Sequence, residues 1–74
     1  MSDDPRIGSP GTYEFSTPDG MLRAEWLGEG PETDGKARER AGEIEREAGG
    51  EFLVTQIRRR TASDWEIVPR FLGS

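Results

Sequence analysis

The stretch QIRRRTASDW, residues 56–65, holds the side chains whose types and spacing most resemble a binding site. It places Arg58, Arg59 and Arg60 in a row shortly before Trp65. Arginine pairs with phosphate and an aromatic ring stacks on a base, so this combination is typical of nucleic-acid recognition. On a strand, however, Arg58 and Arg60 would point to one face and Arg59 to the other. We therefore expect two small charged groups rather than one patch of three.

The distribution of charge argues against a phosphate backbone as the main partner. The chain carries a formal net charge of −5, and residues 1–34 hold eight acids but only two bases. Residues 51–74 hold four bases and three acids, so the basic run belongs to an otherwise acidic molecule. Affinity for nucleic acid comes largely from neutralised phosphates. Binding of nucleic acid through Arg58, Arg60, Trp65 and Arg70 is therefore the alternative hypothesis rather than the leading one.

Catalytic and metal chemistry find little support in the residue types. The chain has no cysteine and no histidine, which removes the commonest nucleophile–base pairs and metal ligands. The carboxylates expected on strands, Glu14, Glu25 and Glu66, are not placed in an apolar pocket that would raise a pKa for acid–base work. In GEGPETDG, residues 28–35, three acids surround the Gly-x-Gly, which suits neither a phosphate loop nor an EF-hand. We expect no enzyme activity, no cofactor and no metal site.

Length and composition predict one small domain that needs a partner. A chain of 74 residues buries only about 60% of its unfolded surface, and neither disulfides nor thiolate metal sites can reinforce it. Residues 1–11, rich in Pro and Gly, are expected to form a flexible arm before a single domain at 12–74. No apolar run approaches ~18 residues and the N-terminus is unlike a signal peptide, which predicts a soluble, cytoplasmic protein. Nine arginines against one lysine favour a bacterial or phage origin.

Residues 12–28 have the pattern of a β-hairpin. Apolar residues alternate with polar ones on both sides of a turn: Tyr13 and Phe15 before it, Leu22, Ala24 and Trp26 after it. In the turn, Pro18 presets φ and Gly20 supplies a positive φ. A three-residue loop with a G1 bulge would pair Phe15 with Arg23 and put the two apolar sets on opposite faces. A two- or four-residue loop would unite them, and we favour this register because burial usually determines the pairing.

The next segment, residues 36–50, has the spacing of a helix. A narrow apolar stripe repeats at helical intervals, formed by Ala37, Ala41, Ile44 and Ala48. Thr33 or Asp34 is the expected N-cap, and Gly49 with Gly50 is the expected end. Because the stripe is mostly alanine, it approaches a sheet closely but buries little area.

Residues 51–60 and 64–72 read as two further strands joined by TASD. In the last strand, Trp65, Ile67, Pro69 and Phe71 share one face, and Glu66, Val68, Arg70 and Leu72 share the other. Pro69 cannot donate to a ladder, which indicates an edge strand or a bulge. The order predicts an α+β fold: a small ββαββ domain whose four-stranded, mainly antiparallel sheet has one helix packed on one face.

One helix leaves the second face of the sheet uncovered, and that face determines the functional hypothesis. The expected core is Tyr13, Phe15, Leu22, Ala24, Trp26, Ile44, Trp65, Ile67 and Phe71. Which alternating set of 51–60 is buried stays open, Phe52 with Val54 or Leu53 with Ile57. The expected partner-binding residues on the other face are Met21, Leu27, Val68 and Leu72, with Arg58, Arg60 and Arg70.

Exposed apolar area on a sheet is typical of an interface. We therefore predict a non-catalytic protein-interaction module, which self-associates as a homo-oligomer or docks on a larger protein. The alternatives are termini that fold back over this face and strand ends that carry these residues without consequence.

Overall fold

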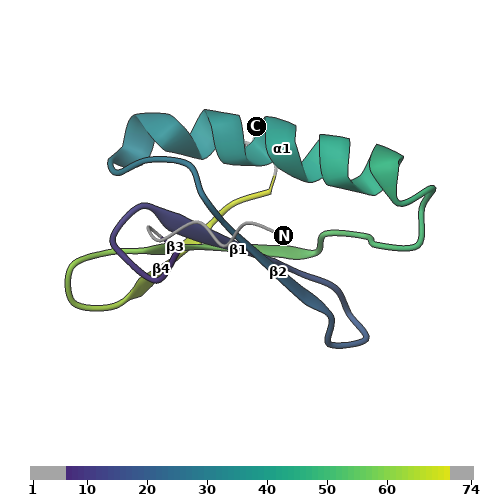
Figure 1. Cartoon of the computed structure of the whole chain (residues 1–74), viewed down its shortest axis with the longest axis horizontal. Helices are drawn as coiled ribbons and strands as arrows, with labels where there is room; N and C mark the ends of the chain where they lie inside the picture. The colour runs from purple at the N-terminus through teal and green to yellow at the C-terminus, as the bar shows by residue number, and fades with distance from the viewer. Residues whose placement is uncertain (1–6, 71–74) are drawn as a thin grey trace.

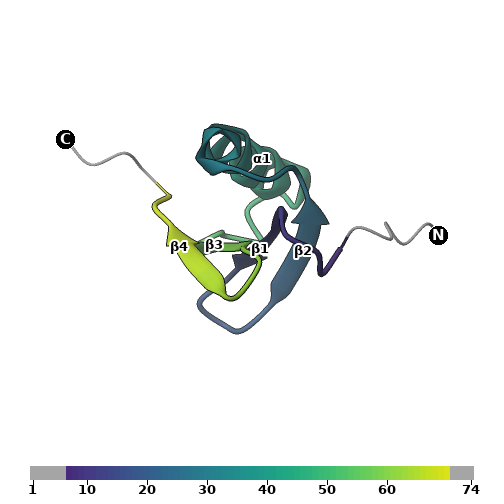
Figure 2. The ribbon, with the colours of Figure 1, turned by 90° about the vertical axis from the view of Figure 1, so that its left-hand side faces the viewer.

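The computed structural model describes residues 7–70, which form one helix and one four-stranded sheet. The elements are β1 (Thr12–Ser16), β2 (Leu22–Trp26), α1 (Asp34–Glu47), β3 (Gln56–Arg60) and β4 (Trp65–Val68). The strand order is β2-β1-β3-β4, and every neighbouring pair is antiparallel. The helix lies across one face of the sheet (Figure 1), which is twisted so that the edge strands β2 and β4 run in different directions (Figure 2). The predicted ββαββ fold is confirmed.

The helix forms where its apolar stripe predicted it. Ala37, Ala41 and Ile44 are buried against the sheet, as expected. Thr33 occupies the N-cap position, but its hydroxyl donates to the carbonyl of Glu29 (3.2 Å) instead of accepting from the first turn. A 3-10 turn, Pro31–Thr33, leads into the helix.

The end of α1 follows the predicted glycine pair. The N–H of Gly49 donates to the carbonyl of Arg46, and that of Gly50 to the carbonyl of Glu45, both at 3.1 Å. With Gly49 at φ +63°, this is a Schellman ending, which needs a residue that tolerates the left-handed region.

The core is a single layer between α1 and the sheet. Its buried members come from the helix, from three strands and from the segment before β3: Tyr13, Phe15, Ala37, Ala41, Ile44, Val54, Ile57 and Val68. Leu27 and Phe52 pack against its margin. Tyr13, Phe15 and Ile44 are thus in the core as predicted, whereas Phe71 lies outside the described residues.

The favoured register of the first hairpin is wrong. Phe15 pairs with Arg23 and Ser16 with Leu22, which is the register of the three-residue loop. The N–H of Thr17 donates to the carbonyl of Met21, and Gly20 has φ +93°, as a G1 bulge requires. Because paired residues point to the same side, Leu22, Ala24 and Trp26 lie on the face away from α1. The core assignment of these three residues is therefore wrong.

The second hairpin is also turned over relative to the expected core. Val68 pairs with the buried Ile57 and is itself 3% exposed. Trp65 and Ile67 consequently lie on the face away from α1, where Ile67 is 64% exposed. The alternation was predicted correctly, but the two faces were exchanged. β3 begins only at Gln56, and β4 is an edge strand that ends before Pro69, as that proline indicated.

Candidate functional site

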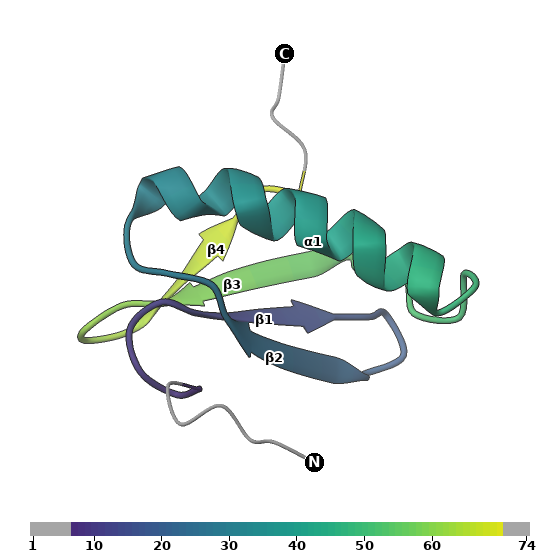
Figure 3. The same ribbon diagram turned by 45° about the horizontal axis from the view of Figure 1, so that its top comes forward.

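No described element covers the side of the sheet opposite α1, and we call the side chains there the open face. The register assigns to it Thr12, Glu14 and Ser16 of β1, Leu22, Ala24 and Trp26 of β2, Gln56, Arg58 and Arg60 of β3, and Trp65 and Ile67 of β4. Figure 3 shows the four strands side by side in the order that brings these residues together. The face therefore has apolar residues on its two outer strands and polar residues on its two inner ones.

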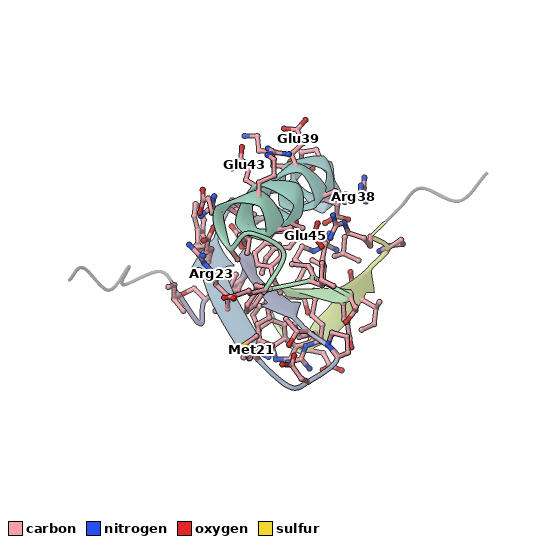
Figure 4. All side chains as sticks on the ribbon, turned by 90° about the vertical axis from the view of Figure 1, so that its right-hand side faces the viewer. Met21, Arg23, Arg38, Glu39, Glu43 and Glu45 are labelled. Atoms are coloured by element: carbon pink, nitrogen blue, oxygen red, sulfur yellow. The ribbon has the colours of Figure 1, made fainter. Side chains whose placement is uncertain are left out.

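The central row of the open face crosses all four strands. Ala24 pairs with Glu14, Glu14 with Arg58, and Arg58 with Ile67. Leu22, in the adjacent row, is 56% exposed, nearly as much as Ile67. Met21, at the turn before β2, is also exposed and lies on the side of the sheet away from the helix (Figure 4). Leu22 and Ile67, both large and aliphatic, are thus exposed to solvent at opposite edges of one face.

Arg58, Arg60 and Trp65 form a cluster on the open face. The guanidinium carbon of Arg58 lies 4.7 Å from the centroid of the Trp65 ring, and that of Arg60 lies 5.7 Å from it. Both distances fall within the range of cation–π attraction. Arg58 also forms an ion pair with Glu14. The sequence correctly predicted that Arg58 and Arg60 share a face and that Arg59 does not.

The segment before β1 closes one corner of this face. The N–H of Gly11 donates to the carbonyl of Arg60 (3.0 Å), and the indole N–H of Trp26 donates to the carbonyl of Pro10 (3.0 Å). The hydroxyl of Thr12 donates to the carbonyl of Ser9 (2.8 Å), and Thr12 is buried. Part of the predicted arm, from Ser9 to Gly11, is therefore hydrogen-bonded to the domain. The rest of the open face stays uncovered by the described residues.

Arg59 works on the helix side of the sheet. It donates to Asp34 at the start of α1 (2.7 Å) and to Glu66 on β4 (2.5 Å), while the hydroxyl of Tyr13 donates to the same oxygen of Asp34 (2.7 Å). Burial, with this hydrogen bond, raises the pKa of Tyr13 far above its ordinary value. Burial lowers the pKa of Arg59, but the bonds to Asp34 and Tyr13 outweigh it and the net shift is upward. This cluster anchors the first turn of the helix.

A second ion pair links α1 to β2. Arg40 binds Glu25 with two hydrogen bonds, of 2.8 and 3.0 Å. The Arg40 hydrogen bond holds the pKa of Glu25 below its ordinary value. The carboxylates of Glu43 and Glu47 lie 3.1 and 3.3 Å from Arg40, so this arginine gathers three acids.

A third ion pair links α1 to the segment that follows β4. Arg70 binds both oxygens of Glu45, at 2.7 and 3.1 Å, and donates to the carbonyl of Val54 (3.0 Å). Glu45 in turn accepts from the N–H of Val54 (2.9 Å), and its pKa is lowered, chiefly by Arg70. Figure 4 shows Glu45 directed toward the strands and Glu39 directed away from them.

The predicted interface residues do not all lie on the open face. Val68 is in the core, Leu27 packs against the core margin, and Arg70 binds Glu45 beside the helix, so placing these three on the open face was wrong. Leu72 lies outside the described residues. Arg58 and Arg60 do lie on it, and Met21 borders it.

The open-face residues that the sequence interpretation had assigned to the core are Leu22, Ala24, Trp26, Trp65 and Ile67. The signal that could have placed the three residues of β2 is the Pro18-Asp19-Gly20 loop, whose length fixes the pairing of the hairpin. For Ile67, no comparable local signal exists, because the alternation in 65–68 leaves both faces open.

Residues 7–70 contain no pocket and no group of three or more carboxylates placed to hold a metal ion. Within the same residues, no helix has the length and apolar character needed to cross a membrane. Comparison with family models, curated proteins and solved structures finds no match to this chain. The open face is therefore the feature of the described residues on which a functional proposal can be built.

Proposed function

We propose that this chain is a non-catalytic protein-interaction module that docks another polypeptide on its open face. The observation that carries the proposal is the position of Leu22, Trp26, Trp65 and Ile67 on one face that no described element covers. An antiparallel sheet with one wet face normally alternates apolar residues inward and polar residues outward. Here both outer strands show apolar side chains to water, which favours an interface.

The polar centre of the face supports docking of a protein rather than insertion into lipid. Glu14, Arg58 and Arg60 lie between the apolar edges, so an occupant must offer both apolar contacts and charged partners. Charged groups at an interface fix the register and select the partner more than they add affinity. A small cytoplasmic accessory, inhibitor or minor assembly subunit of a bacterium or phage would use a surface of this kind.

Site-specific photo-crosslinking tests the proposal. A photo-reactive amino acid replaces Ile67 on the open face, and the matched control carries it in place of Leu53, which is 54% exposed but precedes β3. We expect a discrete polypeptide adduct from position 67 in cells that produce the chain, and its loss after Leu22→Asp at the opposite edge. Equal labelling from both positions, or no adduct from position 67, contradicts the proposal.

One observation favours a second candidate, a nucleic-acid-binding module. Arg58 and Arg60 flank Trp65 on a sheet surface, an arrangement that can stack a base and contact its phosphate. Against it, Glu14 already neutralises Arg58, and Arg70 is bound to Glu45 away from this cluster.

Binding of labelled single-stranded oligonucleotides at low salt separates the two candidates. The nucleic-acid module predicts an affinity that falls steeply with salt and is lost in Arg58→Ala/Arg60→Ala, but not in Arg46→Ala on the helix. Flat titrations at low salt remove this candidate.

A further inference from the structure

We infer that the occupant of the open face is a second copy of this chain, packed face to face about a two-fold axis parallel to the strands. This inference rests on the proposed function and names its partner. A two-fold interface brings the same patch of both copies together, so the patch must be complementary to itself. The register of the sheet allows that condition to be checked residue by residue.

A two-fold axis along the strands reverses the strand order of the second copy. β1 then lies opposite β3 of the second copy, and β2 lies opposite its β4. In the central row, Glu14 faces Arg58 of the second copy, and Arg58 faces its Glu14. Each chain's own Glu14–Arg58 pair thus joins a ring of four alternating charges. Networks of this kind outweigh isolated surface pairs.

The charges also select this axis over the other in-plane choice. An axis across the strands would place Glu14 opposite Glu14 and Arg58 opposite Arg58, and like charges facing each other oppose association. Only the axis along the strands places opposite charges together in both halves of the central row. The sheets need not be strictly aligned, because stacked twisted sheets pack at roughly 30° to one another.

The apolar residues of the central row are complementary in size under the same axis. Ala24, the smallest side chain of β2 on this face, lies opposite Ile67 of the second copy, which is the most exposed large apolar residue within 7–70. The Ala24–Ile67 contact thus places a small side chain against a large one, as interdigitating sheets require. In the neighbouring row, Trp26 lies opposite Trp65, so two aromatic rings meet there.

The size of the face predicts a reversible dimer. Four strands spaced by ~4.8 Å, three of them five residues long and β4 four residues long, give a flat footprint of roughly 300 Å². Because side chains project from the flat sheet, the two copies together bury on the order of 1,000 Å² of accessible surface, at the low end of specific interfaces. We therefore expect a dissociation constant in the micromolar range, measurable by analytical ultracentrifugation.

Charge reversal in separate chains tests the arrangement. Glu14→Arg and Arg58→Glu each place like charges across the interface, so each variant is expected to be monomeric where the wild type is dimeric. When the two variants are mixed, every facing pair is again opposite in charge, and a 1:1 heterodimer should form. The pair within each chain stays broken in the mixture, so recovery of the dimer cannot come from repair of the fold. Circular dichroism of each variant establishes that it is folded.

A second pair of variants at exposed edge positions guards against misfolding. Ala24→Lys and Ile67→Glu should each weaken the dimer at least tenfold, and their mixture should associate more tightly than either variant by itself. The matched control, Leu53→Glu, should leave the dimer unchanged. Mixtures that stay monomeric while the wild type dimerises overturn the arrangement.

The outcome for this inference is separable from that for the proposed function. A wild-type chain that stays monomeric at about 500 μM overturns the second copy as occupant. If the crosslinker at position 67 still captures a different polypeptide, the proposed function stands without the homodimer. If position 67 captures no polypeptide, both are overturned.

Discussion

Removing the carboxylate of Asp34 is the most informative perturbation of the fold. Asp34 accepts hydrogen bonds from the Tyr13 hydroxyl and from Arg59 through the same oxygen, at 2.7 Å each. Tyr13 is completely buried, and the Arg59 side chain is 13% exposed. In Asp34→Ala, the Tyr13 hydroxyl therefore loses the acceptor of its hydrogen bond, and Arg59 loses the Asp34 carboxylate while it keeps that of Glu66.

The expected loss of stability is about 3 kcal/mol. An orphaned buried hydroxyl costs about 1–3 kcal/mol, and a hydrogen bond to a charged group contributes about 1.5–3 kcal/mol. The negative charge at the start of α1 adds about 0.3–1 kcal/mol through the helix dipole. A domain of 74 residues has a total stability of about 4–11 kcal/mol. The substitution should therefore remove a large share of it and lower Tm by about 12–24 °C.

Urea unfolding followed by tryptophan fluorescence measures the effect. Asp34→Asn keeps an acceptor oxygen but loses the charge, so it should cost about 1 kcal/mol. Tyr13→Phe combined with Asp34→Ala should cost about 1–2 kcal/mol less than the sum of the single changes, because no hydroxyl is orphaned. Glu39→Ala removes the same charge from the outer side of α1 and should stay within about 0.5 kcal/mol of wild type. A loss in Asp34→Ala no larger than in Glu39→Ala, or strict additivity with Tyr13→Phe, refutes the reasoning.

Three further predictions concern stability. The hydrogen bond from Arg40 lowers the pKa of Glu25 from 4.5. The stability that this ion pair gives the folded state is therefore complete above about pH 4.5 and is lost as the pH falls through the lowered pKa. Glu25→Gln should therefore flatten the acid limb of a pH–stability curve. Gly42→Ala should raise the free energy of unfolding by about 0.5–1 kcal/mol, since the helix has room for the methyl group. Gly11→Ala should destabilise the domain in the same urea assay, because Gly11 has φ +103° and its Cβ would lie 2.8 Å from the Trp26 indole nitrogen.

The features that the sequence predicted correctly are local ones. The stripe of Ala37, Ala41 and Ile44 and the ending at Gly49 each depend on neighbouring residues within one or two turns, and both were confirmed. The edge position of β4 was also foreseeable, because Pro69 lacks the donor that a central strand needs. The element order followed from the same short-range signals, whereas the strand order β2-β1-β3-β4 was not predicted.

The features that depend on pairing between distant segments were not predictable in this way. Which carboxylate each arginine binds depends on the packed structure: Arg59 reaches Asp34 and Arg70 reaches Glu45, in each case from another element. Composition shows only that many such pairs are available. For the same reason, the sequence did not decide which face of β3 is buried. Ile57 rather than Arg58 faces α1 because Ile57 pairs with Phe15 of β1, which is in the core.

At residues 17–21, the turn sequence favours one register of the hairpin and the burial of apolar side chains favours another. The structure has the register that the turn favours. Had burial determined the register, Leu22, Ala24 and Trp26 would face α1. Instead Arg23 and Glu25 lie on that side, and Glu25 binds Arg40 across the helix margin. Leaving the apolar residues of β2 out of the core costs little stability because the alanine stripe of α1 packs close to the sheet. The narrow space between them is already filled by Tyr13, Phe15 and Ile57. The apolar residues of β2 are thereby left on the open face, so the length of one loop determines which surface this protein presents to a partner.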